Sequence, residues 1–142
     1  MDVRTFMRRD LRQMVNYQVQ PVRGIKMDAN ESPFPMSREL RGELAKWIQE
    51  EETLRFYPDT DCVELRRAIA EANGLSVEQV LCGVGSDQII DFLMKTFLEE
   101  GDAILVPEPS FSMYALSAKI NHGQAVAFDL NAEDFSYPVD RI

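Results

Sequence analysis

The chain has 142 residues, of which 45% are hydrophobic and 27% are charged, a composition typical of a soluble globular domain and not of a disordered segment. Its 15 Lys and Arg residues against 24 Asp and Glu residues give a net charge of −9, which excludes nucleic acid and anionic membranes as favoured partners. No apolar run reaches the ~18 residues of a transmembrane helix, and the two cysteines form no ligand or disulfide pattern, so we expect a cytoplasmic protein.

Residues 1–36 are expected to form an N-terminal arm. Apolar side chains recur at helical spacing between residues 2 and 15, which predicts an amphipathic helix. Residues 16–36 contain Gly24 and the closely spaced Pro33 and Pro35, without a sustained period, which indicates an extended segment, with one short strand at 25–27.

Residues 37–54 are expected to form a helix that leads into a larger domain, of which residues 55–142 are the first part. Ser37 is a suitable N-cap, and apolar side chains follow at positions 40, 44, 47 and 48, on one helical face. In the third part, Asp61 and Glu64 approximate a capping box, which predicts a helix that ends at Gly74.

Strands and helices then alternate. Short apolar runs predict strands at 80–84, 103–106 and 124–128, and helical patterns lie between them, the first ending near Gly101 and the second over 110–120. We expect Pro107 and its neighbours to end the second strand. This order predicts an α/β fold with a parallel sheet and right-handed crossovers. Three strands cannot cover both faces and edges of such a sheet, so we expect the chain to be the front part of a larger protein.

A glycine-rich turn links the first of these strands to the next helix. In residues 83–87 (GVGSD), Gly85 allows close backbone approach, and the helix N-terminus offers free N–H groups and a positive dipole, which together favour a phosphate. The turn is not a Walker P-loop, and Gln88 departs from the G-x-G-x-x-G pattern. An ordinary tight turn capped by Ser86 is the alternative.

A second candidate loop, residues 109–114, follows the next strand. Ligands of parallel sheets bind beyond the carboxyl ends of the strands, so Phe111 is expected either to stack on a planar ligand or to pack in the core. His122 is the one histidine, and no nucleophile motif accompanies it. If the protein is an enzyme, its reactive centre is therefore expected to be a cofactor or to lie outside these residues.

Four segments, in order and at similar spacing, resemble histidinol-phosphate aminotransferases, which are pyridoxal-phosphate (PLP) enzymes of the aspartate-aminotransferase fold. They are residues 27–35 (MDANESPFP), 55–59 (RFYPD), 85–88 (GSDQ) and 109–114 (PSFSMY). The resemblance covers the chain from about Tyr17 onward. It implies a three-layer parallel-sheet fold, truncated after the first strands of the large domain, and amino-group transfer between histidinol phosphate and 2-oxoglutarate in histidine biosynthesis.

The resemblance also implies which residues bind the cofactor, pyridoxal 5'-phosphate. Gly85, Ser86 and Asp87 would present donors to its phosphate, and Phe111 would stack on its pyridine ring, where the family often has tyrosine. Tyr57 would cross the interface of a homodimer with shared active sites and reach the phosphate in the partner subunit.

The resemblance places Tyr17 and Asn30, and Asp28 with them, near the substrate, a phosphorylated amino alcohol or amino acid. The lysine that forms the Schiff base is expected beyond Ile142, because none of the four lysines present has the family's setting: Lys26, Lys46, Lys95 and Lys119. The 142-residue segment alone is thus expected to be inactive. Three alternatives stay open: a fold-related PLP enzyme such as a threonine-phosphate decarboxylase, a non-catalytic phosphate-binding α/β module, and a dimerisation fragment.

Overall fold

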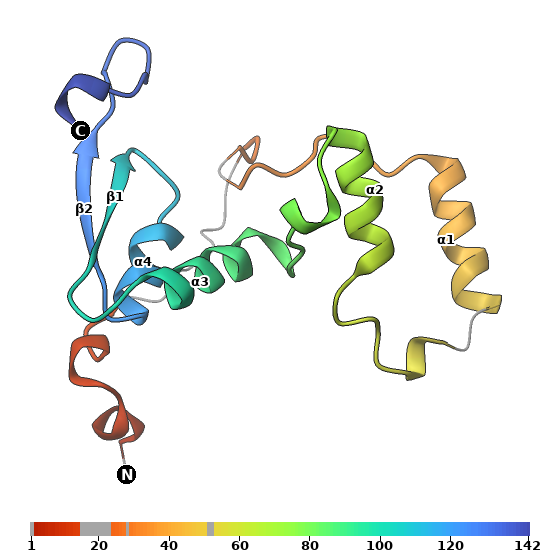
Figure 1. Cartoon of the computed structure of the whole chain (residues 1–142), viewed down its shortest axis with the longest axis horizontal. Helices are drawn as coiled ribbons and strands as arrows, with labels where there is room; N and C mark the ends of the chain where they lie inside the picture. The colour runs from red at the N-terminus through yellow and green to blue at the C-terminus, as the bar shows by residue number, and fades with distance from the viewer. Residues whose placement is uncertain (1, 15–23, 28, 51–52) are drawn as a thin grey trace. The chain divides into compact units, whose positions relative to one another are not determined.

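The computed structural model describes residues 2–14, 24–27, 29–50 and 53–142. The chain divides into two compact units, Met1–Thr60 and Asp61–Ile142, and each has its own internal packing (Figure 1). Among the described helices, none combines the length and apolarity that crossing a bilayer requires.

The helix predicted from residue 2 to 15 is wrong for the described part of that range. Two residues with extended ψ angles, 151° and 137°, interrupt it. The guanidinium of Arg12 donates to the backbone carbonyls of Thr5 and Met7, at 2.9 and 3.1 Å, and so occupies acceptors that a continuous helix would use. The strand predicted at 25–27 is absent as well, because these residues have no regular structure. Short 3₁₀ turns are found at Val3–Phe6, Arg9–Leu11 and Thr53–Arg55.

The helix predicted after Ser37 is confirmed as α1, Arg38–Glu50. The Ser37 hydroxyl accepts a hydrogen bond from the N–H of Leu40 at 3.1 Å, which satisfies one of the donors that a helix start leaves free. The four apolar side chains on its common face are each about half exposed.

The second unit begins with α2, Val63–Asn73, which ends as predicted at Gly74, where φ is +65°. The predicted capping box of Asp61 and Glu64 is wrong. The residue that precedes the helix is Cys62, in the left-handed region at φ +47°, and Asp61 therefore lies one position too early to cap. A reciprocal capping box forms further on, where Gln79 closes on Ser76 around a 3₁₀ turn at Val77–Gln79.

The strand predicted at 80–84 does not form. Its backbone groups bond to side chains instead of a neighbouring strand: the Val80 carbonyl accepts from Arg66 at 2.7 Å, and the Val84 N–H donates to Gln88 at 2.6 Å. A β-ladder needs a paired strand, and the two strands in the described part of the chain pair with each other.

The rest of the unit is a βαβ arrangement preceded by a helix. α3 supplies Ile90 and Met94 to the core, and α4 supplies Ala118. β1 and β2 are parallel, with Ala103 opposite Gln124 and Glu108 opposite Asp129 (Figure 1). The elements are α3 (Gly85–Phe97), β1 (Ala103–Glu108), α4 (Met113–Ile120), β2 (Gln124–Asp129) and a 3₁₀ turn at Val139–Arg141.

The α/β class with parallel strands is therefore confirmed, and two of the three predicted strands form. The strand predicted at 103–106 continues through Pro107 to Glu108, so its predicted end is wrong by two residues. α4 packs against α3 and against both strands, as expected of the crossover helix in such a unit.

Candidate functional site

The first turn of α3 carries Gly85, Ser86 and Asp87, the residues predicted to hold a phosphate. Gly85 has a φ of +78°, which residues with side chains rarely adopt, and the space that its Cβ would take is open. Ser86 and Asp87 are exposed, and N–H groups in a first helical turn have no acceptor within the helix. These donors and the helix dipole fit an anion. The Asp87 carboxylate only accepts, so its contribution is its backbone N–H.

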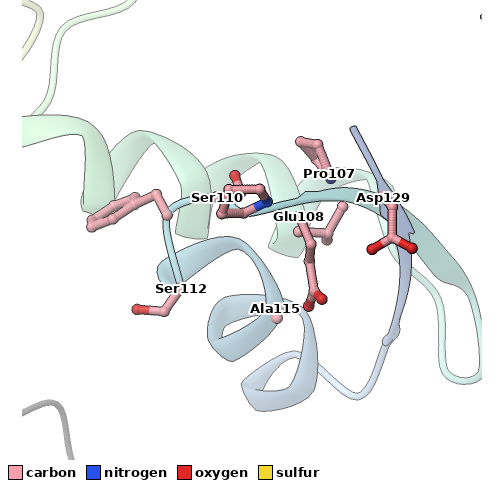
Figure 2. Close-up of a pocket in the computed structure, with 9 residues that line it drawn as sticks. Pro107, Glu108, Ser110, Ser112, Ala115 and Asp129 are labelled. Atoms are coloured by element: carbon pink, nitrogen blue, oxygen red, sulfur yellow. The ribbon is translucent and has the colours of Figure 1, made fainter. Parts of the chain in front are cut away.

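A pocket of about 570 Å³ lies at the carboxyl ends of β1 and β2. Phe111 lines it with 45% of its surface exposed, and the edge-to-face contact of its ring with Tyr114, at a centroid distance of 5.9 Å, supports one side. A partly exposed aromatic ring at the edge of a pocket suits stacking on a planar ligand. Figure 2 labels six other lining residues: Pro107, Glu108, Ser110, Ser112, Ala115 and Asp129.

The remaining predicted site residues belong to the first unit. Tyr57 follows the 3₁₀ turn at Thr53–Arg55, and its side chain is fully exposed. Asn30 is exposed and left-handed, with a φ of +49°. Tyr17 and Asp28 lie outside the described residues. The structure thus brings the phosphate turn and Phe111 into one unit and leaves Tyr57 and Asn30 in the other.

Three of the four lysines form ion pairs with carboxylates, and none of the four is among the described residues that line the pocket. The ammonium of Lys95 on α3 pairs with the carboxylate of Asp91 at 2.5 Å. The other two pairs join Lys26 to Glu31 at 3.0 Å and Lys46 to Glu50 at 3.9 Å, while Lys119 lies in the last turn of α4.

Sequence reasoning missed two residues near these sites. Asp129 ends β2 and stands in register with Glu108, so two carboxylates border the pocket. The rule that placed Phe111 beyond a strand end also applies to Asp129, which follows the strand predicted at 124–128. In the sequence, Gln88 is a departure from a nucleotide-binding pattern and the last residue of the segment 85–88 that resembles the family. The structure shows in addition that its side-chain oxygen accepts from the backbone N–H of Val84, which precedes α3.

Comparison with known proteins identifies the family. The chain matches the model of the family Aminotransferase class I and II over residues 22–142. It is 43% identical over 143 residues to the histidinol-phosphate aminotransferase of Ruminiclostridium cellulolyticum, covering 99% of this chain and 40% of that protein. It is 35% identical to the enzyme of the same name from Caldanaerobacter subterraneus subsp. tengcongensis, covering 98% and 39%. The chain thus spans about two fifths of the length of these curated relatives.

Solved structures agree on the fold. The aromatic aminotransferase of Pyrococcus horikoshii superposes with a TM-score of 0.67 at 25% identity, covering 78% of this chain and 31% of that one. The alpha-aminoadipate aminotransferase of Thermus thermophilus, complexed with N-(5'-phosphopyridoxyl)-L-leucine, superposes with a TM-score of 0.61 at 27% identity, covering 73% and 27%. The predicted aspartate-aminotransferase fold is confirmed, and this chain belongs to the class I and II aminotransferase family.

Proposed function

We propose that this chain is the phosphate- and ring-binding part of a PLP-dependent aminotransferase that exchanges an amino group between histidinol phosphate and 2-oxoglutarate in histidine biosynthesis. The observation that carries the proposal is the first turn of α3, where Gly85 opens the backbone to an anion. The relatives named above are histidinol-phosphate aminotransferases, which favours this substrate over that of a threonine-phosphate decarboxylase.

The chain's own residues account for binding and orientation. The N–H groups of Ser86 and Asp87 would bind the cofactor phosphate, Gly85 would let the anion approach the backbone, and Phe111 would supply a face for the pyridine ring. When bound, the cofactor stores the amino group between the two halves of the reaction. The pocket at the strand ends, lined by apolar side chains such as those of Pro107 and Phe111, would offer the ring a partly apolar surface.

The first unit contributes the parts that act on the substrate and on a second subunit. Tyr57, fully exposed, is free to reach the cofactor phosphate in the partner of a homodimer. Asn30, held in a left-handed turn, faces the phosphorylated substrate together with Tyr17, which lies outside the described residues. We infer that the lysine that binds the cofactor covalently lies beyond Ile142, since no lysine is among the described residues that line the pocket.

We further propose that the chain consists of three parts and that the enzyme is cytoplasmic. Residues 1–36 are the arm and the segment over the substrate, residues 37–54 the linking helix, and residues 55–142 the start of the cofactor-binding domain. The side-chain capping of α1 by Ser37 supports the boundary between the first two parts.

Binding of pyridoxamine phosphate, which forms no bond to lysine, tests the phosphate turn directly. In Gly85→Ala, the added methyl group would occupy the open space that the anion needs. We expect it to displace the anion from one charge-assisted hydrogen bond and so to weaken binding roughly tenfold or more. Isothermal titration calorimetry of the full-length enzyme with pyridoxamine phosphate gives the affinity. Pyridoxamine without the phosphate is expected to bind both proteins equally.

Gly74→Ala is the matched control. Gly74 also has a positive φ, +65°, and open space around its Cβ position, but it ends α2 instead of facing a ligand. The two variants therefore carry similar backbone strain. An equal loss of affinity in both, or no loss in Gly85→Ala, would contradict the placement of the phosphate.

A further inference from the structure

Gln88 holds the backbone that leads into α3. Its side-chain oxygen Oε1 accepts a hydrogen bond from the N–H of Val84 at 2.6 Å. A backbone N–H only donates, so the amide oxygen must face Val84 and the amide nitrogen points elsewhere. The same oxygen closes over Gly83, where a Cβ would lie 3.0 Å from it and 2.8 Å from Cδ1 of Ile89. Gly83 thus gives the Gln88 side chain the room to fold back.

This contact changes which donors remain for a ligand. A helix leaves four N–H groups without acceptors at its start, which here belong to residues 84–87. Gln88 takes the N–H of Val84, and the Gly83 carbonyl takes the N–H of Gly85 at 3.0 Å. The two groups next in line, on Ser86 and Asp87, belong to exposed residues. The N–H groups of Val84 and Gly85 are therefore engaged within the protein, and those of Ser86 and Asp87 remain for a ligand.

We propose that Gln88 is a positioning residue for the phosphate turn: by binding Val84 it sets the direction in which Ser86 and Asp87 present their N–H groups. This inference rests on the proposed function, because it assumes that an anion binds there. Gln88 itself does not touch the anion. Its effect is pre-organisation, since a turn that is held before binding loses less conformational freedom when the ligand arrives.

The test replaces Gln88 by an apolar side chain of similar length. Gln88→Met removes the acceptor, and we expect affinity for pyridoxamine phosphate to fall about three- to tenfold, the range of one net hydrogen bond. Affinity for pyridoxamine, without the phosphate, is expected to stay unchanged. Amide hydrogen exchange at Val84 in the ligand-free protein is expected to accelerate, which reports the broken contact independently of any ligand.

Gln79→Met is the matched control. Gln79 lies in the same unit, and its Oε1 likewise accepts a hydrogen bond from a backbone N–H, that of Ser76 at 3.0 Å. This contact does not involve the phosphate turn. Gln88→Glu keeps an acceptor oxygen and is expected to restore the slow exchange at Val84. If Gln79→Met weakened phosphate binding as much as Gln88→Met, the effect would be one of general stability and the proposal would be overturned.

Gly85→Ala separates this inference from the proposed function on which it rests. If Gly85→Ala weakens phosphate binding and Gln88→Met does not, the phosphate site stands and the role of Gln88 is wrong. If neither variant changes the affinity, the phosphate turn itself is wrong, and the positioning role is overturned with it. Loss in both variants, with Gln79→Met unaffected, supports both.

Discussion

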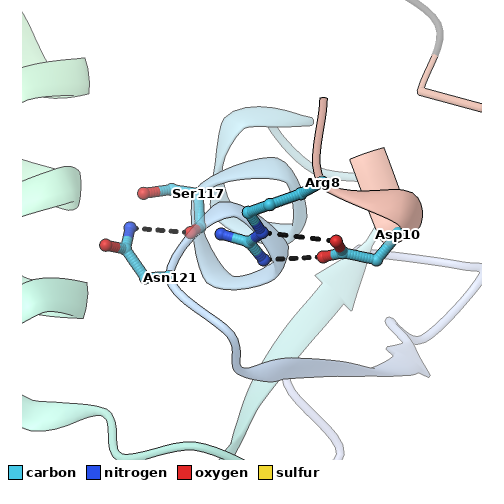
Figure 3. Close-up of polar contacts among 4 residues, drawn as sticks. All are labelled: Arg8, Asp10, Ser117 and Asn121. Atoms are coloured by element: carbon cyan, nitrogen blue, oxygen red, sulfur yellow. Dashed lines mark hydrogen bonds and ion pairs between the residues drawn. The ribbon is translucent and has the colours of Figure 1, made fainter. Parts of the chain in front are cut away.

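Asp91 on α3 binds one partner on its own helix and a second, Asn121, at the end of α4. Its Oδ2 accepts from the ammonium of Lys95 on its own helix at 2.5 Å, and its Oδ1 accepts from the side-chain amide of Asn121 at 3.0 Å. The amide of Asn121 also donates to the Ser117 carbonyl at 2.9 Å, as Figure 3 shows. The bond from Lys95 and then the bond from Asn121 hold the pKa of Asp91 below its usual 3.8.

The lowered pKa predicts how stability depends on pH. A carboxyl group whose pKa is lower in the folded state stabilises the fold fully above its unfolded pKa, and that contribution is lost as the pH falls through the folded value. We therefore expect Asp91→Asn to be less stable than the native chain at pH 7, with the difference shrinking below about pH 3.8. Native-state amide hydrogen exchange in α3 at pH 7, 5 and 3, corrected for the intrinsic exchange rate at each pH, measures it. A difference that did not change with pH would show that the charge of Asp91 is irrelevant.

At the scale of an element, Arg66 fastens α2 to the segment that follows it. Its guanidinium donates to three backbone carbonyls, those of Val80 at 2.7 Å, Val77 at 2.8 Å and Asp61 at 3.4 Å. The guanidinium fork is suited to several acceptors at once. These bonds replace the ladder that a strand at 80–84 would have provided, and so determine the path of the chain into the phosphate turn.

Arg66→Met is expected to destabilise the second unit by about 1.5–3 kcal/mol, because a hydrogen-bonded charge is removed and partly buried carbonyls lose their donor. Native-state amide hydrogen exchange along α2, which needs no cooperative transition, measures the change. Arg67→Met, at the exposed neighbouring position on α2, changes the net charge equally and is expected to stay within about 0.5 kcal/mol. Similar losses in the two variants would assign the effect to net charge and not to the carbonyl contacts.

The elements differ in how well local sequence predicts them. α1 was predicted because its apolar period and the Ser37 cap are both local. The strand at 80–84 was wrong because an apolar run shows β-propensity but not whether a partner strand is present. The 2–15 helix failed because Arg12 competes for its carbonyls, a side-chain contact that no periodicity reveals.

The same distinction holds for the candidate site. Phe111 could be placed from the alternation of strands and helices, since ligand loops follow strand ends. Gly85 and Ser86 could be placed only at the start of a helix, because the strand predicted before them does not form. The roles of Gln88 and of the Glu108–Asp129 pair could not, because they depend on one rotamer and on strand register. Across the molecule, sequence predicts which elements exist more readily than which backbone groups they bond.

At the scale of the whole molecule, the second unit buries little apolar surface. The apolar residues that are buried in the described part of the chain include two alanines, so their side chains contribute little area: Ala70, Ile90, Met94, Val106 and Ala118. Each strand of the two-stranded sheet also has one unpaired edge. Burial of this extent scarcely offsets the conformational entropy that folding costs, about 1–2 kcal/mol per residue for the backbone alone.

We therefore expect the 142-residue chain, expressed by itself, to unfold gradually on heating and to bind the dye ANS at its exposed apolar surface. A cooperative domain of this length would absorb about 100 kcal/mol near 60 °C, which scanning calorimetry detects easily. Ile90→Ala sharpens the comparison: it would lower the midpoint of a cooperative transition by several degrees but has little to change in a gradual one. A single sharp transition that Ile90→Ala shifts would show that the small core suffices.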